Sequence, residues 1–256
     1  MTKRKTRKVK REIKKRVLNI LTFVSVILSV SFILNSNNFK DIKGAIIGED
    51  NVDRLGEYKE AFSEDVNQNM NYQYLELINK NNNIDLNYEP NDLVIPSIRF
   101  GNIGNMMVQY VRRDVAVALE KLFKAAKNGG INLVAISGYR SYDYQKNIYD
   151  NEVNNVGKIQ ANRYVAKPGQ SEHQTGLAMD LLSDEYMNLD EGFENTESFR
   201  WLEENMSKFG FILRYPKGKE DITGYGYEPW HIRYVGVEDA KKIMDEGLTL
   251  EEYLSR

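Results

Sequence analysis

The chain contains no cysteine and has only two histidines among its 256 residues. Without cysteine, disulfide bonds, thiolate metal ligands and a lipoprotein anchor are excluded, so any metal ion must be held by nitrogen and oxygen. The two imidazoles, His173 and His231, are the side chains best suited to metal binding or proton transfer near neutral pH. Such sparing use of histidine predicts that both serve the chemistry of the protein.

The body of the chain also lacks an excess of positive charge. Residues 1–16 contain ten Lys/Arg and one acidic residue, whereas residues 17–256 contain 25 basic and 36 acidic residues. Nucleic-acid phosphates are bound by clustered cations, so we expect no nucleic-acid partner. The hydrophobic content of 41% is enough to bury the core of an ordinary domain.

Long apolar runs are scarce, with an exception at residues 17–34, which carry no charge. As a helix this run would be about 27 Å long, just enough to cross the hydrocarbon core of a bilayer. A secretory signal peptide is the alternative, but cleavage needs small residues at positions −3 and −1, and residues 34–37 (Leu-Asn-Ser-Asn) offer a poor site. We therefore favour an uncleaved anchor.

The basic run before this segment predicts its orientation, because positively charged flanks stay in the cytoplasm. The expected organisation is a cytoplasmic tail (1–16), a single transmembrane anchor (17–34), a polar stalk (35–71) and a folded domain (72–256). The protein is thus expected at the cell membrane, with its amino terminus cytoplasmic and its folded domain extracellular.

Helical and extended patterns are interspersed over residues 72–256 without a regular βαβ rhythm, which favours the α+β class. Apolar spacing predicts helices over 111–127, 199–209, 237–244 and 250–254, and a polar helix is expected over 142–155. Alternating or continuous apolar residues predict strands over 74–78, 133–136, 177–182, 211–215 and 231–235. Gly129 and Gly210 follow two of the helices and are expected to end them.

Asp180 is the natural companion of the two histidines. A catalytic zinc site usually has three protein ligands and an open position for water. Asp180 lies seven residues after His173, and Ala178 and Asp180 share one face of the predicted strand. Gly176 and Ala178 are small, so the backbone can pass close to an occupied site. We therefore expect His173, Asp180 and His231 to bind one metal ion.

Two further side chains suggest hydrolytic chemistry. Glu228 lies three residues before His231, close enough to accept a proton from water at the metal and pass it to a leaving amine. Arg140 follows a buried strand and can hold a carbonyl oxygen or a carboxylate. Each residue also has a structural alternative: a solvated acid for Glu228, an ordinary ion pair for Arg140 and a turn cap for Asp180.

Three segments together resemble a known family. They are residues 137–141 (Ser-Gly-Tyr-Arg-Ser), 171–180 (Ser-x-His-x-x-Gly-x-Ala-x-Asp) and 228–231 (Glu-Pro-Trp-His). Their order and spacing are similar to the signature blocks of VanY-type D-alanyl-D-alanine carboxypeptidases. These zinc peptidases are grouped with the VanX dipeptidases and the Hedgehog amino-terminal domain. The resemblance covers about residues 72–245.

The resemblance implies a small central antiparallel sheet flanked by helices. It implies one Zn²⁺ ion held by His173, Asp180 and His231, with Glu228 as the general base and acid. It also implies that Arg140 steadies the scissile carbonyl.

By the same resemblance, Gln145 and Ser171 contact the terminal carboxylate of the substrate. The implied substrate is the peptidoglycan stem peptide, from which a terminal D-alanine is removed as a D,D- or L,D-carboxypeptidase.

The expected partners are these stem peptides and, through residues 17–34, the membrane; the protein is expected to be a monomer. Two alternatives remain open. One is a catalytically inactive module that binds or senses cell-wall peptides, and the other is a peptidoglycan endopeptidase.

Overall fold

The computed structural model describes residues 74–101 and 106–256. The predicted tail (1–16), anchor (17–34) and stalk (35–71) lie outside these residues. Within the described part, no helix combines the length and the apolar character needed to cross a bilayer. The membrane topology therefore stays a prediction from the sequence.

The elements alternate irregularly between helix and strand, as expected for the α+β class. In chain order, with η for 3₁₀ helices, they are β1 (Leu93–Val94), η1 (Met106–Gln109), β2 (Val111–Arg112), α4 (Arg113–Asn128), β3 (Leu133–Ser137), α5 (Tyr142–Val156), α6 (Lys158–Tyr164), η2 (Glu172–Thr175), β4 (Ala178–Ser183), η3 (Glu191–Asn195), α7 (Glu197–Asn205), η4 (Met206–Phe209), β5 (Phe211–Leu213), α8 (Glu220–Thr223), β6 (His231–Tyr234), α9 (Val237–Asp245) and α10 (Leu250–Leu254).

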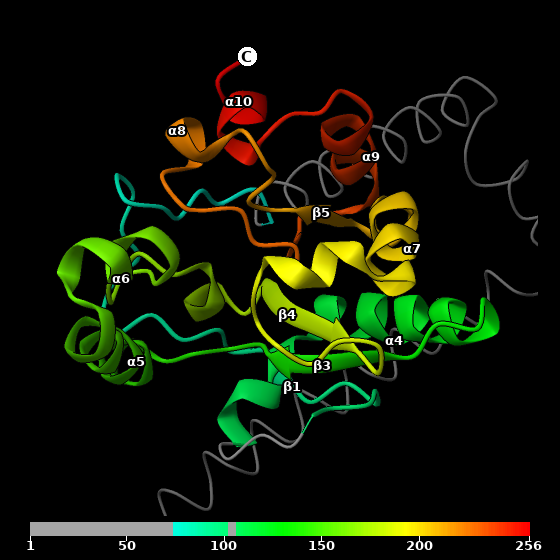
Figure 1. The fold of residues 1–256 in the computed structure, drawn as a ribbon, viewed down its shortest axis with the longest axis horizontal. Helices are drawn as coiled ribbons and strands as arrows, with labels where there is room; N and C mark the ends of the chain where they lie inside the picture. Colours follow the sequence, from blue (N-terminus) through cyan, green and yellow to red (C-terminus); the bar gives the residue numbers. More distant parts are fainter. Residues whose placement is uncertain (1–73, 102–105) are drawn as a thin grey trace, which may run out of the picture. The chain divides into compact units, whose positions relative to one another are not determined.

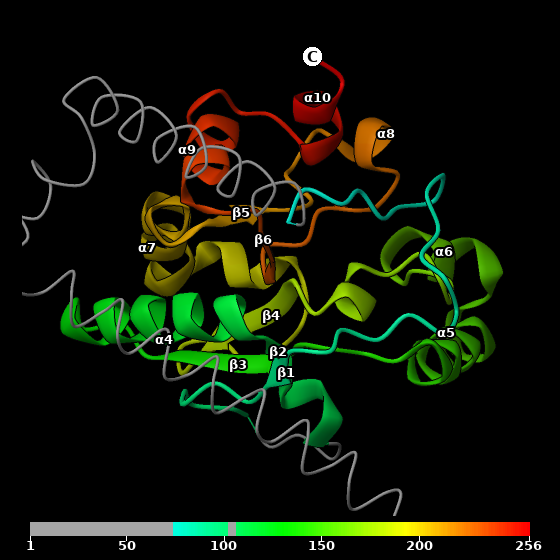
Figure 2. The same ribbon diagram turned by 180° about the vertical axis from the view of Figure 1, so that it is seen from behind.

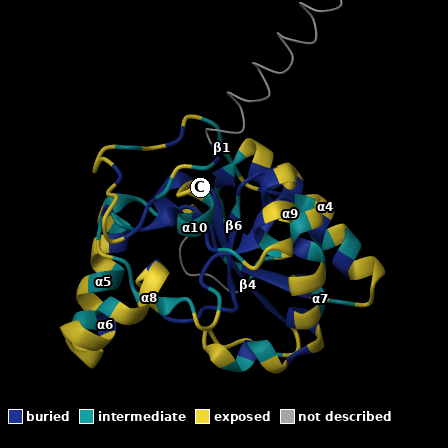
Figure 3. Cartoon of the chain, turned by 90° about the horizontal axis from the view of Figure 1, so that it is seen from above, coloured by how far each residue is buried: buried dark blue, intermediate teal, exposed yellow. Residues whose placement is uncertain are grey.

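The centre of the domain is a four-stranded sheet in the order β3-β4-β6-β5, with every neighbouring pair antiparallel. A two-stranded antiparallel ribbon, β1-β2, accompanies it. All six residues of β4 are buried, and β4 and β6 run through the buried middle of the molecule (Figure 3). The predicted antiparallel sheet is thus confirmed, with β4 and β6 as its central pair.

Helix α4 forms because one of its faces is apolar and the other charged. Val115, Leu119, Leu122 and Ala126 recur at helical spacing, are buried, and belong to the main core. Each fully buried leucine contributes about 1.5–3 kcal/mol to stability. The amide of Gly129 then donates to carbonyls of the last turn, which ends the helix.

The helices are distributed unevenly around the sheet. Helices α5 and α6 lie side by side at one end of the domain, away from α4, α7 and α9 (Figures 1 and 2). Most of their outward surface is exposed (Figure 3). The chain returns from α6 to the sheet through residues 165–177, which include η2.

Most of the predicted elements are present within one or two residues, but the strand predicted over 74–78 is wrong. Residues 75–78 form neither helix nor strand. The carbonyl oxygens of Tyr74 and Glu76 instead accept hydrogen bonds of 2.8 Å each from Nη2 of Arg233. A buried guanidinium thus satisfies backbone groups that a neighbouring strand would otherwise pair.

Candidate metal centre and active site

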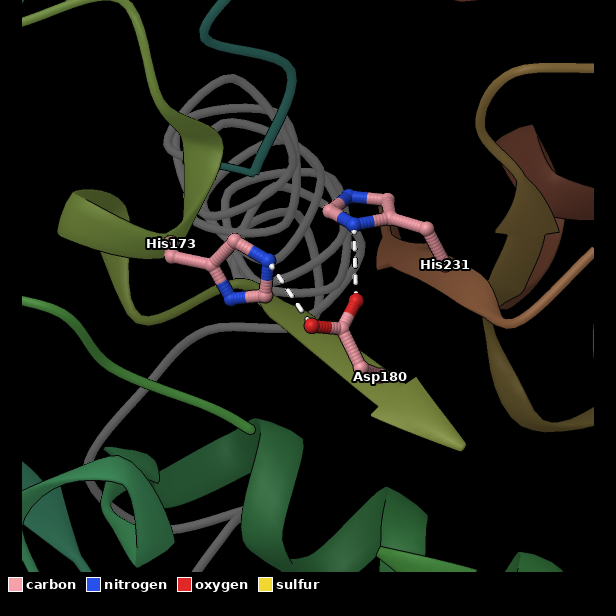
Figure 4. Close-up of side chains that lie close together, drawn as sticks. All are labelled: His173, Asp180 and His231. Atoms are coloured by element: carbon pink, nitrogen blue, oxygen red, sulfur yellow. Dashed lines mark hydrogen bonds and ion pairs between the residues drawn. The ribbon is translucent and has the colours of Figure 1, made fainter. Parts of the chain in front are cut away.

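The three predicted metal ligands converge from three different elements. His173 lies on η2, Asp180 on β4 and His231 on β6, and both imidazoles point at the Asp180 carboxylate (Figure 4). Nδ1 of His231 is 3.0 Å from Oδ1 of Asp180, and Nε2 of His173 is 3.4 Å from Oδ2. One ligand atom from each residue fits within a span of 4.8 Å. The structure therefore brings together the set predicted from the sequence.

The local backbone places these side chains. Asp180 and His231 are direct partners in the antiparallel pairing of β4 with β6, so their side chains leave the sheet on the same face. His173 reaches the same point because η2 ends at Gly176, whose φ of +67° reverses the chain into β4. A side chain at Gly176 would also press on Arg112 and Leu93, each 3.1 Å from a Cβ at that position.

A hydrogen bond sets the orientation of His173. Its Nδ1 lies 2.7 Å from the carbonyl oxygen of Gly138, so Nδ1–H donates and the lone pair is left on Nε2. Nε2 is the nitrogen that faces Asp180. Such a contact behind a histidine is the usual way in which a metal ligand is held in the correct tautomer.

The donor set fits a divalent metal ion. The ligand side chains are almost fully buried, and two imidazoles with one carboxylate are a known combination for zinc. Burial by itself lowers the pKa of His231, but the carboxylates of Asp180 and Glu172 outweigh it and raise the pKa to about 9. The negative charge gathered around this imidazole therefore favours a cation here.

Glu228 lies beside this centre and is also buried. Its Oε2 is 3.9 Å from Nδ1 of His231. Burial raises the pKa of Glu228 to about 8, the negative charge of Asp180 adds to the increase, and the charges of His231 and Arg140 oppose it. A carboxyl group that titrates near neutral pH can both take up and release a proton, as acid–base catalysis requires.

Arg140 is held at the edge of the same centre. Its Nε donates to Oγ of Ser137 at 2.8 Å, and its Nη2 donates to Oδ2 of Asp180. The backbone amide of Arg140 also donates to the carbonyl of His173. The guanidinium is thus fixed against the Asp180 carboxylate, while part of it remains exposed.

All seven predicted site residues line one cavity of about 470 Å³. This volume suits a small molecule or the end of a peptide. Gln145 donates from Nε2 to the carbonyl of Ala166 at 2.8 Å, which leaves its second N–H for another acceptor. Ser171 precedes η2 and is buried. Other side chains of the cavity wall are Tyr144, Ile148, Glu152, Tyr164, Leu189, Tyr225 and Trp230.

The sequence analysis missed an ionic cluster behind the metal ligands. The carboxylate oxygen Oε1 of Glu172 accepts hydrogen bonds of 2.7 Å from Nε of Arg214 and 2.7 Å from Nη1 of Arg233. Both arginine side chains are 0% exposed. The signal was present in the sequence, since an arginine within an apolar strand pattern requires a buried anion as a partner.

Comparison with known proteins agrees with this geometry. Residues 108–237 match the family model described as VanY, D-alanyl-D-alanine carboxypeptidase. The chain is 52% identical over 183 residues to the putative carboxypeptidase YodJ of Bacillus subtilis (strain 168), a match that covers 71% of this chain and 67% of that protein.

Two solved structures are similar in fold and sequence. The LdcB LD-carboxypeptidase has a TM-score of 0.66 and 53% identity, with 70% of this chain and 84% of that chain covered. A mutant of the vancomycin-resistance D,D-pentapeptidase VanY in complex with Zn(II) has a TM-score of 0.58 and 38% identity, covering 71% of this chain and 99% of that chain. The chain therefore belongs to the VanY family of D-alanyl-D-alanine carboxypeptidases, which are hydrolases.

Proposed function

We propose that the protein is a zinc carboxypeptidase that removes the terminal D-alanine from peptidoglycan stem peptides. The observation that carries this proposal is the convergence of His173, Asp180 and His231 at one point of a cavity that Glu228 also lines. The metal is Zn²⁺, as in the solved VanY structure. One ion fits the three ligands.

A Zn²⁺ ion held by His173, Asp180 and His231 would supply Lewis-acid chemistry for the scissile carbonyl and for water. Glu228 takes the proton from the attacking water and gives it to the nitrogen of the leaving D-alanine. Its raised pKa suits both steps, because the carboxylate and the carboxylic acid are then both accessible near neutral pH.

Arg140 and two other residues position the substrate. The guanidinium of Arg140, held by Ser137 and Asp180, donates to the oxygen of the scissile carbonyl as it gains negative charge. The second N–H of Gln145 and the hydroxyl of Ser171 bind the terminal carboxylate. A requirement for that carboxylate makes the enzyme an exopeptidase acting at the end of the stem.

The comparisons favour the tetrapeptide stem as the preferred substrate. Identity with the LD-carboxypeptidase LdcB is 53%, against 38% with the D,D-pentapeptidase. Both substrates end in D-alanine and differ in the residue before it, so the same metal centre serves either reaction. Which of them is cleaved faster depends on the cavity wall beyond the metal.

The test is to incubate the purified, zinc-loaded protein with tetrapeptide, pentapeptide and cross-linked stems, and to identify the products by mass spectrometry. Release of one D-alanine, faster from the tetrapeptide, is the expected result. Cleavage of the cross-linked dimer alone would establish an endopeptidase instead. Tight stem binding without any turnover would establish an inactive binding module.

The proposed place of action is the outer side of the membrane. Residues 17–34 would anchor the chain, and the predicted stalk of residues 35–71 would carry the monomeric catalytic domain towards the cell wall. Protease added outside intact cells should then digest the catalytic domain. Its protection until the cells are opened would contradict this topology.

A further inference from the structure

Glu172 is a neighbour of both histidines of the proposed metal site. It faces His231 in the structure and immediately precedes His173 in the sequence. It is the first residue of η2, and its side chain is buried. The two side chains diverge: His173 points at Asp180, whereas Glu172 extends between His231 and the two arginines. Glu172 lies beyond the metal ligands and outside the steps of the proposed reaction.

Two buried polar atoms face each other at this point. Oε2 of Glu172 and Nε2 of His231 lie 3.7 Å apart. Among the described residues, neither atom has a hydrogen-bond partner. A buried polar atom without a partner is destabilising, so an acceptor and a donor placed face to face complement one another. A shortening of about 0.5 Å makes the contact an ordinary hydrogen bond.

We infer that Glu172 is a positioning residue that accepts the Nε2–H of His231. The other ring nitrogen, Nδ1, then carries the lone pair that points toward Asp180 and the metal. His173 uses Nδ1–H for the carbonyl of Gly138 and leaves Nε2 free. The two histidines thus present opposite nitrogens to the ion, and each is held by a different acceptor. This inference rests on the proposed metal site.

The arginines explain why Glu172 is suited to this role. Both guanidinium groups donate to the same oxygen, Oε1, which leaves Oε2 turned toward His231. Arg214 is fixed in turn by a two-fold hydrogen bond to Glu251, at 2.8 and 2.7 Å. The carboxylate therefore has one orientation, with its remaining oxygen behind the metal ligand.

The variant Glu172→Gln reverses the polarity of this contact while keeping its shape. The amide oxygen stays with the two guanidinium groups, so the amide NH₂ faces Nε2 of His231. A donor at that position favours the tautomer with the proton on Nδ1, the nitrogen that the metal needs. We expect zinc affinity, measured on apo-protein by competition with a chromophoric chelator, to fall about 10–100-fold.

Glu251→Gln is the matched control, because Glu251 shares Arg214 with Glu172 but makes no contact with His231. It should change zinc affinity by less than about two-fold. An affinity of Glu172→Gln equal to that of the wild type, or an equal loss in both variants, would mean that Glu172 serves only the structural ion cluster.

NMR of the imidazole nitrogens in zinc-loaded wild type provides a readout that does not depend on a variant folding. The expected protons are on Nε2 of His231 and on Nδ1 of His173. A proton on Nδ1 of His231 would overturn the inference. Wild-type protein that binds zinc but hydrolyses no stem peptide would reject the proposed function alone, whereas failure to bind zinc would reject both.

Discussion

The carbonyl oxygen of Gly138 lies 2.7 Å from Nδ1 of His173 and selects the nitrogen that this histidine offers to the metal. Gly138 directly follows β3, and its own amide donates to the carbonyl of Val108. A backbone group at the end of a central strand therefore orients the His173 side chain on η2.

Gly138→Ala should weaken both folding and metal binding. A Cβ at this position would lie 2.5 Å from the carbonyl oxygen of Tyr110 and 2.9 Å from Cγ1 of Val111, so the backbone must move. We expect a loss of about 1–3 kcal/mol in the free energy of unfolding, measured with urea. Gly129→Ala, whose Cβ would meet Trp201 at 3.1 Å, is the milder control. Equal zinc affinity in Gly138→Ala and wild type would contradict the role of this carbonyl.

Mutations of the metal ligands and of the acid–base residue should have different effects on zinc binding and on turnover. His173→Ala and His231→Ala each remove an imidazole ligand and should yield protein without stoichiometric zinc. Glu228→Gln should retain zinc, since it keeps the shape of the side chain, while D-alanine release falls about 10²–10⁴-fold. Elemental analysis and product release measure the two properties. Turnover by Glu228→Gln at the wild-type rate would exclude Glu228 as the proton-transfer group.

Removal of the metal should lower thermal stability. Free zinc at about 1,000 times its dissociation constant stabilises the folded state by about 4 kcal/mol. For a domain of this size that corresponds to a fall in Tm of roughly 8–16 °C after chelation. His231→Ala should show almost no response to the chelator. A wild-type Tm that is unchanged by chelation would argue against a metal in the folded protein.

Arg140→Ala should reduce turnover more than zinc binding. The loss of a preorganised donor to a developing oxyanion costs about 10²–10³-fold in kcat. The control is Arg99→Ala, which removes an exposed arginine that also pairs with an aspartate, Asp184, at 2.7 Å. Steady-state kinetics on the stem peptide should show full activity for the control. A purely raised KM in Arg140→Ala would assign the guanidinium to binding instead.

The sequence was sufficient to predict that His173, Asp180 and His231 converge, because these residues lie in short, ordered segments. Asp180 and His231 occupy strands whose apolar patterns are clear, and His173 is tied to Asp180 by a seven-residue spacing. The helix of α4 and the strand β3 were equally clear, since their buried faces follow regular periods. Local pattern and tertiary structure agree at these positions.

What the sequence did not reveal depends on contacts between distant residues. Apolar and polar side chains alternate over residues 74–78 as in a strand. The carbonyl oxygens of Tyr74 and Glu76, however, accept hydrogen bonds from Arg233, which lies 159 positions after Tyr74. The two strand arginines indicate a buried anion, but only the folded structure identifies that anion as Glu172. Arg140 was expected at the scissile carbonyl. Its ion pair with Asp180 could not be predicted, because the sequence does not show which face of β4 the segment after β3 covers.

Asp180 and His231 are 51 positions apart in the sequence, yet they are direct partners across the two central strands. A metal ion bound to both would close a chain loop of that length at the middle of the sheet, much as a disulfide does in a disulfide-bonded domain. Unlike a disulfide, such a metal link would be reversible and would open on addition of a chelator or acid. Reductants, which open disulfide-stabilised domains, have no bond to attack in a chain without cysteine.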